Sequence, residues 1–317
     1  MMHRTIAALL LLASLALGAI FASACEEEEE GEGRVRVLTS IQVFADLIGN
    51  VAGDRAQVTA LIPSDADPHT HEPSPRQVVD VTEADLVLLN GLGFEETLED
   101  IIENNVREGV PVIEMSEGLS TIDGEHEHEL GNPHLWLNVQ HAMHYIEMTR
   151  DGLIRVDPEG EEEYRGNAEE YLAELSALDE EVAEKISSIP PASRKIIMHH
   201  NAFPYFARRY GMEVAAFVVE SPGREPSAGE VARLTEEIES LGLPAVFKEP
   251  QFRSRVLEMA AEEADVALCT LYTGALDEDV DTYVKLIRHD ADELVRCLGG
   301  QGRAFSVTDS AQNVEDL

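Results

Sequence analysis

Several histidines occupy positions where a folded α/β chain would bring side chains together. Each follows or ends a strand-like segment: His69 and His71 after the second, His134 after the fourth, and His199 and His200 at the end of the fifth. Open α/β sheets bind ligands beyond the carboxyl ends of their strands. If these ends face one cleft, three imidazoles meet there, and such donors suit Zn²⁺, which binds nitrogen at about 2.0–2.1 Å.

The elements that would position these histidines alternate between short β-branched runs and helical patterns. The first half has predicted strands at 34–40, 57–63, 85–91 and 110–115 and helices at 43–51, 74–83 and 95–105. The second half has predicted strands at 195–199, 213–219, 245–248 and 266–271 and helices at 202–210, 228–241, 254–264 and 281–298. Repeated strand–helix units favour parallel sheets covered on both faces, so we predict an α/β fold with two (β/α)4-type sandwich lobes.

One long amphipathic helix separates the two predicted lobes. Apolar residues recur at steps of three or four from Tyr164 to Ile189, and prolines flank the segment at Pro158 and Pro190. A helix over this range spans roughly 45 Å, so it would be rigid and brace both lobes around a metal site in the cleft. The predicted divisions are an N-terminal lobe at 34–157, a linking helix at 158–190, a C-terminal lobe at 191–300 and a tail at 301–317.

The N-terminus has the layout of an export signal. A short basic start precedes an apolar run at 6–21, which is too short for a convincing membrane span, and small residues lead to Cys25. This resembles a bacterial lipoprotein signal at 1–24, with Cys25 lipidated; the alternative is an ordinary secretory signal in which Cys25 has no role. The glutamate-rich segment 25–33 repels itself and indicates a flexible tether. We expect a protein anchored by lipid on the outer, periplasmic side of the cell membrane.

The composition narrows the function classes. The 317 residues include 23 Lys and Arg against 62 Asp and Glu, a net charge of −39, which argues against a nucleic-acid partner. Besides Cys25 only Cys269 and Cys297 remain, too few for a small disulfide-stapled scaffold. Pairing of these two is one possibility in the oxidising exterior, although the sequence does not fix their separation.

Five motifs in combination resemble a known family. They are DPHTHEPSPRQV at 67–78, ADLVLLNGLGFE at 84–95, NPHLWLN at 132–138, HNAFPYFARRYG at 200–211 and FKEPQF at 247–252. From about Val35 to Leu298 the chain is similar to the cluster A-I solute-binding proteins, the ZnuA/TroA-like metal-binding lipoproteins of bacterial zinc and manganese ABC transporters. The resemblance implies the fold already inferred, two α/β lobes joined by a rigid long helix.

The resemblance also implies a ligand set and a function. By similarity the metal ligands are His69, His134 and His200, with His200 preferred to His199 because it immediately precedes Asn201 and the Ala-Phe pair. The implied function is capture of a divalent transition metal outside the membrane and its delivery to an ABC permease and its ATPase. We expect a monomer that binds and does not catalyse.

The chain departs from the family at the fourth ligand. Many members supply an aspartate after the last strand, and Gly274 stands at that place here. A water or a nearby carboxylate, Asp277 or Asp279, is the favoured replacement, followed by His71. Glu249, at the end of a predicted strand, points toward the same cleft, where it would tune or supplement the site or form structural hydrogen bonds.

The donor set favours zinc over manganese. Manganese members of the family tend to have Glu in place of His200 and keep the aspartate, so three histidines without an evident carboxylate favour Zn²⁺. Mn²⁺ and a manganese- or iron-specific protein of the same family remain the alternative. His126 and His128, in the acidic loop before the HLWL motif, are typical either of auxiliary zinc capture or of a solvated loop.

Two other function classes are compatible with these features. A zinc-dependent hydrolase would also use three histidines and a water, but the sequence has no H-E-x-x-H helix, no recognisable general base beside the histidines and no nucleophile elbow. A surface adhesin is the other class, because lipoproteins of this family are sometimes described that way. Tight stoichiometric metal binding without turnover would favour the transport protein over both.

Overall fold

The computed structural model describes residues 33–122, 130–219, 228–252 and 254–299. The chain divides into a unit of residues 1–34 and a unit of Val35–Leu317, and the second unit is described here. No helix within the described ranges is both long and apolar enough to cross a membrane. Several predicted features lie outside the described residues: the signal at 1–24, the lipidation site Cys25, the tether at 25–33 except Gly33, the capture loop with His126 and His128, and the tail at 301–317.

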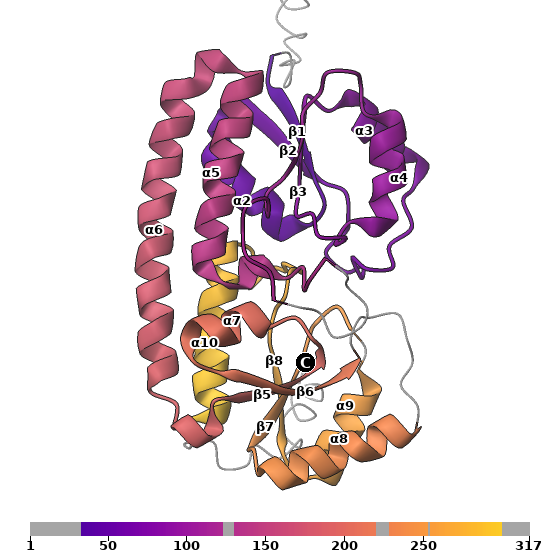
Figure 1. Cartoon of the computed structure of the whole chain (residues 1–317), viewed down its shortest axis with the longest axis vertical. Coiled ribbons are helices and arrows are strands. Elements are labelled where there is room, and N and C mark those ends of the chain that lie inside the picture. The colour runs from indigo at the N-terminus through magenta and orange to yellow at the C-terminus, as the bar shows by residue number, and fades with distance from the viewer. Residues whose placement is uncertain (1–32, 123–129, 220–227, 253, 300–317) are drawn as a thin grey trace, which may run out of the picture. The chain divides into compact units, whose positions relative to one another are not determined.

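The first half of the unit forms a parallel four-stranded sheet with the order β2-β1-β3-β4. Its strands are β1 (Val35–Thr39), β2 (Ala56–Ala60), β3 (Leu86–Leu89) and β4 (Val112–Glu114), and its helices are α2 (Gln42–Ala52), α3 (Pro75–Glu83) and α4 (Glu96–Asn105). The four apolar residues of β3 are all buried, as expected for a strand with helices on both faces. Helices α3 and α4 lie on one side of this sheet and α2 on the other (Figure 1).

The second half repeats this architecture with the strand order β6-β5-β7-β8. Its strands are β5 (Lys195–His200), β6 (Glu213–Val219), β7 (Ala245–Lys248) and β8 (Ala267–Thr270), and its helices are α7 (Pro204–Tyr210), α8 (Ala228–Leu241), α9 (Arg255–Glu263) and α10 (Tyr283–Leu298). Helices α8 and α9 lie on one side of the sheet and α10 on the other (Figure 1). The predicted α/β fold with two parallel sheets is confirmed.

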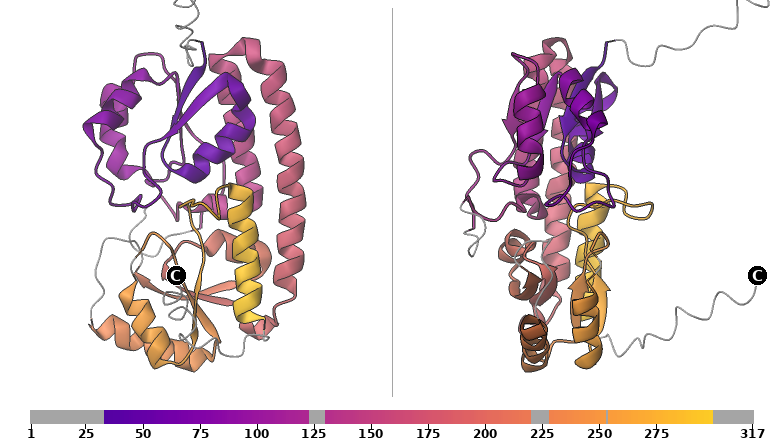
Figure 2. Two further views of the ribbon diagram at one scale, coloured as in Figure 1. Left: turned by 180° about the vertical axis from the view of Figure 1, so that it is seen from behind. Right: turned by 90° about the vertical axis from the view of Figure 1, so that its right-hand side faces the viewer.

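Two long helices connect the sheets. Helix α5 (Val139–Val156) packs along α6 (Glu161–Ser187), and α6 extends beside both sheets in two views (Figures 1 and 2). At 27 residues, α6 is about 40 Å long. Its buried face carries the predicted apolar series, Tyr164, Ala168, Tyr171, Leu175, Leu178, Val182 and Ile186. A 3-10 turn at Pro158–Gly160 precedes it, while the lobe boundaries at 34–157, 158–190 and 191–300 stay a prediction.

A buried carboxylate on α6 forms hydrogen bonds that hold the neighbouring helices in place. Asp179 accepts hydrogen bonds from Nε of Arg209 at 3.0 Å and from the hydroxyl of Tyr210 at 2.9 Å, both on α7. Its other oxygen pairs with Arg209 and accepts a weak bond from Gln140 of α5 at 3.4 Å. Farther along α6, Glu181 pairs with Arg288 of α10. These contacts tie α6 to helices that precede and follow it in sequence.

Direct hydrogen bonds also join the two halves near the histidines. Nε1 of Trp136 donates to the carbonyl of Thr273 at 2.6 Å, and the hydroxyl of Tyr283 donates to the carbonyl of Trp136 at 2.7 Å. The backbone amide of Tyr283 donates to Asp46 on α2 at 2.8 Å. One hydrophobic core runs from Val37 to Leu298 through both halves. The segment that follows His134 is therefore held against the second half of the unit.

A buried carboxyl group ties the end of β1 to the loop after β3. Glu95 accepts hydrogen bonds from the hydroxyl of Ser40 and the amide of Asn90, both at 2.8 Å, and from the amide of Gly91 at 3.0 Å. Burial raises the pKa of Glu95 to about 7, although the three hydrogen bonds act in the opposite direction. Nδ2 of Asn90 in turn donates to the carbonyl of Pro133, the residue before His134.

Cys269 of β8 and Cys297 of α10 form a disulfide, which resolves the pairing that the sequence left open. The two sulfurs and a carboxylate oxygen of Glu293 also lie close enough together to hold a metal. Because a thiolate is required for metal binding, the disulfide prevents that use of the cysteines. The bond closes a segment with a sequence separation of 28 residues.

Removing this disulfide should destabilise the protein. For a loop of this length the chain-entropy model gives about 3–4 kcal/mol. We expect the double variant Cys269→Ala/Cys297→Ala to lose about that much free energy of unfolding in urea. A reducing agent should destabilise the wild type similarly and leave the double variant unaffected, and equal unfolding curves for the two proteins would contradict the prediction.

Glu95 should make stability depend on pH. Its pKa is higher in the folded state, about 7, than the usual 4.5, so its stabilising contribution is complete below about pH 4.5 and is lost as pH rises through 7. The change is about 3 kcal/mol at most. Relative to wild type, Glu95→Gln should gain stability by up to that amount between pH 5 and 8, measured by urea unfolding with a chelator present. Parallel pH profiles of the two proteins would show that Glu95 does not titrate in this range.

Candidate metal centre

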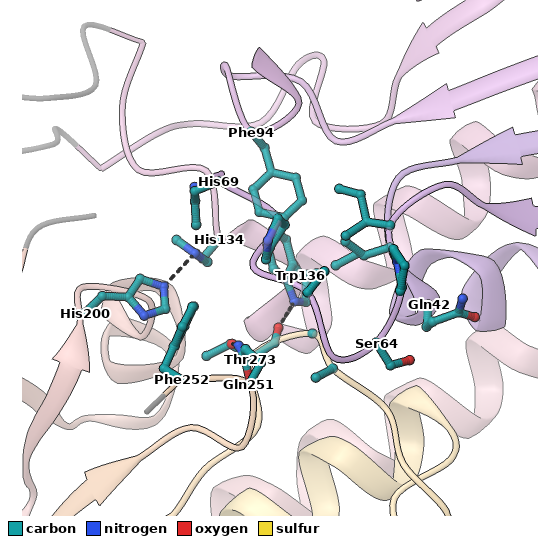
Figure 3. Close-up of a pocket in the computed structure, with 17 residues that line it drawn as sticks. Gln42, Ser64, His69, Phe94, His134, Trp136, His200, Gln251, Phe252 and Thr273 are labelled. Carbon is teal, nitrogen blue, oxygen red and sulfur yellow. Dashed lines mark hydrogen bonds between the residues drawn. The ribbon is translucent and has the colours of Figure 1, made fainter. Parts of the chain in front are cut away.

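Three histidines converge beyond the ends of the two sheets. His69 lies in the loop between β2 and α3, His134 precedes the short 3-10 helix Leu135–Leu137, and His200 is the last residue of β5. Each offers one ring nitrogen, and the three atoms all lie within 4.8 Å of one another. Figure 3 shows the rings gathered at one side of a pocket that all three residues line. The predicted convergence of strand ends is what brings them together.

The loop that carries His69 is shaped by Asp67. One oxygen of the Asp67 carboxylate accepts a hydrogen bond from the amide of His69, and the other accepts one from the hydroxyl of Thr70, both at 2.9 Å. This is an Asx-type turn, in which an aspartate side chain replaces a backbone acceptor. Helix α3 then begins directly after the loop, with Ser74 and Gln77 forming a capping box. His69 is half-buried, whereas His134 and His200 are buried.

Asn132 orients the ring of His134. Oδ1 of Asn132 lies 3.1 Å from Nδ1 of His134 and also accepts the backbone amide of His134 at 3.0 Å. Nδ2 of Asn132 donates to the carbonyl of Asn201, next to His200, which fixes the amide orientation. Nδ1 of His134 is therefore the protonated nitrogen, and Nε2 carries the lone pair. Asn138, the last residue of the same NPHLWLN motif, has a different role and caps the N-terminus of α5.

Glu249 orients the ring of His200 in the same way. This fully buried carboxylate, directly after β7, lies 2.8 Å from Nδ1 of His200 through Oε1. Its second oxygen accepts a hydrogen bond from the hydroxyl of Thr273 at 2.7 Å. Nε2 of His200 is thus free of the carboxylate and lies 3.2 Å from Nε2 of His134. Tuning of the site and structural hydrogen bonding, the roles predicted for Glu249, would both use these contacts, and the choice between them stays a prediction.

An aromatic ring lies beside each of the three imidazoles. Ring centroids are 5.4 Å apart for His69 and Phe94, 5.2 Å for His134 and Trp136, and 5.3 Å for His200 and Phe252. Phe94 and Trp136 are almost fully buried. Such a wall limits access of water and strengthens electrostatic interactions inside the site. None of these rings was predicted to belong to the site, although each lies within one of the five motifs.

The other predicted ligands are not brought to this cluster. His71 lies against the side-chain amide of Gln77, 2.9 Å from its Nε2. Asp277 accepts the hydroxyl of Tyr272 at 2.6 Å, and Asp279 is exposed. None of the three is among the residues that line the pocket, whereas Gly274 is.

Two polar pocket residues were missed by the sequence analysis. Thr273 and Gln251 line the pocket and form hydrogen bonds with Glu249. Gln251 lies in a turn after β7, two residues after Glu249, and its place in the FKEPQF motif was the available signal. Thr273 is adjacent to Gly274, the position at which the family's fourth ligand was expected to be replaced.

Residues 37–297 match the family described as ZnuA, zinc-uptake complex component A, periplasmic. The manganese-binding lipoprotein MntA of Halalkalibacterium halodurans is 33% identical over 286 residues, which cover 87% of this chain and 94% of the relative. The manganese ABC transporter substrate-binding lipoprotein PsaA of Streptococcus anginosus is 27% identical over 91% of this chain and 97% of its own.

Solved structures give the same result. The periplasmic zinc-binding protein TroA of Treponema pallidum matches with a TM-score of 0.78 and 26% identity, over 84% of this chain and 99% of its own. A manganese-bound periplasmic metal-binding protein from Candidatus Liberibacter asiaticus matches with a TM-score of 0.76 and 25% identity, over 84% of this chain and 100% of its own. The chain therefore belongs to the ZnuA family of zinc-uptake complex component A proteins.

Proposed function

We propose that this protein is the substrate-binding component of a metal ABC transporter and that His69, His134 and His200 bind its cargo. The observation that carries the proposal is the convergence of three ring nitrogens within 4.8 Å, at a site where two of the rings are oriented by hydrogen bonds. Relatives named as metal-binding and substrate-binding lipoproteins support it.

The spacing of the two buried histidines suits a first-row metal ion. Two nitrogen ligands at about 2.0–2.1 Å in a tetrahedral site lie roughly 3.3 Å apart. Nε2 of His134 and Nε2 of His200 are 3.2 Å apart, so an ion needs little movement of either ring. His69, on the more exposed loop, would supply the third nitrogen.

We propose Zn²⁺ as the preferred cargo. Imidazole suits zinc, whereas carboxylate and carbonyl oxygens suit manganese, and nitrogen sites generally bind Zn²⁺ more tightly than Mn²⁺. No aspartate or glutamate occurs among the described residues that line the pocket. The named relatives bind either metal: MntA and PsaA are named for manganese, and TroA is described as zinc-binding. The donor set of this chain is therefore the argument for zinc.

The hydrogen bonds of the nearby carboxylate, Glu249, favour metal binding over catalysis. Glu249 faces Nδ1 of His200 and the hydroxyl of Thr273, so it is engaged away from the metal side of the ring. The relatives are named as binding proteins and not as enzymes. Release is compatible with such a site, because protons compete with metal for neutral histidines.

The relatives' names support the partners and location that we propose. A substrate-binding lipoprotein of an ABC transporter works with a permease and an ATPase, and we propose the same partners for this chain. We also propose attachment to the outer face of the membrane through lipid on Cys25 and action as a monomer.

Substitution of a ligand should abolish tight binding. We expect His69→Ala, His134→Ala and His200→Ala each to weaken Zn²⁺ binding by more than about 100-fold, because removing a ligand costs more than the 10–100-fold typical of an outer partner. Competition titration with a chromophoric chelator measures this. His144→Ala is the control, since its ring contacts the carbonyl of Glu117 and does not line the pocket. Unchanged zinc affinity in the three variants would refute the site, and preference for Mn²⁺ at equal free concentration would refute the choice of metal.

Glu249→Gln should weaken zinc binding without abolishing it. The amide oxygen can still accept from Nδ1 of His200, but it makes the ring a weaker donor than a carboxylate does, so we expect a loss of about 10–100-fold. The same titration measures it, with the melting temperature of the metal-free variant as a check on folding. Wild-type affinity would mean that the buried carboxylate serves the fold alone.

A further inference from the structure

One side-chain oxygen in the pocket has no hydrogen-bond partner among the described residues. Gln251 lines the pocket with the three histidines, and its Oε1 atom is buried without a hydrogen bond to any of these residues. Buried polar atoms are nearly always satisfied by protein or by ordered water. A buried, unpaired acceptor in the pocket that the three imidazoles also line therefore indicates a bound donor at this position.

The hydrogen-bond network fixes which end of the Gln251 amide faces its neighbours. Nε2 of Gln251 donates to the hydroxyl oxygen of Thr273 at 2.8 Å and lies 3.4 Å from Oε2 of Glu249. That hydroxyl donates its own proton to Glu249. Rotating the amide by half a turn would place Oε1 against these two acceptors. Oε1 is thus the atom that is left unpaired.

The other described pocket residues considered for this position do not offer an acceptor for the bound donor. The hydroxyl of Thr273 is already used as both donor and acceptor. Gly274 has no side chain, and a Cβ atom there would lie 2.9 Å from Cδ1 of Ile41. The remaining labelled polar residues of the pocket, Gln42 and Ser64, lie on the far side of Trp136 from the histidines (Figure 3).

We propose that Oε1 of Gln251 holds a water molecule that occupies the fourth coordination position of the ion bound by the three histidines. This inference rests on the proposed function and specifies how its site is completed. A metal-bound water is a strong hydrogen-bond donor, and the amide oxygen of glutamine is an acceptor that cannot remove its proton. Gln251 is a positioning residue in this arrangement, since it contacts the water and not the ion.

The same network connects the water to a ligand. Thr273 and Gln251 both contact Glu249, which holds Nδ1 of His200. One buried polar cluster would therefore orient a ligand ring and the fourth ligand together. The water stays neutral beside an amide, which suits a site that binds and releases an ion without hydrolysing anything.

The test uses Co²⁺ as a spectroscopic probe and azide as a competitor for the water. The variant is Gln251→Met, which keeps the length of the side chain and removes the acceptor. The matched control is Gln42→Met, the same substitution in the same pocket on the far side of Trp136. We measure the visible spectrum of the Co²⁺ form during azide titration, the Zn²⁺ affinity by chelator competition and the melting temperature of each metal-free protein.

Azide should change the spectrum of wild-type Co²⁺ protein, because it displaces an exchangeable water. Gln251→Met should bind Zn²⁺ about tenfold more weakly, the effect of one hydrogen bond to a metal-bound group, and should need less azide for half conversion. Gln42→Met should match the wild type in both assays. A merely structural effect would lower metal affinity without making the water easier to displace.

Three results would overturn the inference: a wild-type Co²⁺ spectrum insensitive to azide, equal Zn²⁺ affinities for Gln251→Met and Gln42→Met, or an unchanged azide requirement in Gln251→Met. All three leave the proposed function intact. Failure of the wild type to bind Zn²⁺ or Co²⁺ would instead refute the proposed function.

Discussion

The contact between the Glu249 carboxylate and Nδ1 of His200 is the interaction on which the centre depends. A fully buried carboxylate loses its hydration, and that cost is offset only by close donors. Glu249 has two at short range, His200 and Thr273, which lie on different segments of the second half. The arrangement that satisfies the carboxylate also fixes the ring nitrogen that faces the cleft. Stability of the core and orientation of the ligand are therefore consequences of the same contacts.

The rigid connection between the sheets matters for the same reason. His134 and His200 come from different halves, yet their Nε2 atoms lie 3.2 Å apart. That spacing is maintained by bonds across the halves, such as Trp136 to the carbonyl of Thr273 and Asn132 to the carbonyl of Asn201. Asp179 on α6 adds a buried anchor for α7, which follows the His200 strand. If the lobes were loosely hinged, part of the free energy of ion binding would be used to bring the ligands together.

Local patterns in the sequence predicted most of the fold. An all-apolar run such as β3 and a capping sequence such as Ser74 to Gln77 carry their structure in a few neighbouring residues, so the strands and helices that were given ranges differ from the structure only at their ends. No range was predicted for the long helix α5. The three histidines could be placed because each follows a strand. The partners of Glu249 and the amide orientation of Gln251 could not, because they depend on contacts between residues far apart in sequence. For the fourth position the sequence offered a water, a nearby carboxylate or His71, and it gave no sign of the unpaired amide oxygen of Gln251.

The net charge of −39 acts over longer distances than the contacts within this site. Surface carboxylates raise the local concentration of any cation, and their attraction weakens as the salt concentration rises. Such long-range attraction does not distinguish zinc from calcium or magnesium. The described pocket is lined instead by imidazoles, aromatic rings and neutral amides, with Glu249 behind the ring of His200. In the proposed site the Glu249 carboxylate acts through the ring of His200 and not on the ion directly. The proposed function thereby separates attraction from selection: the acidic surface would gather cations, and the neutral nitrogen donors would select among them.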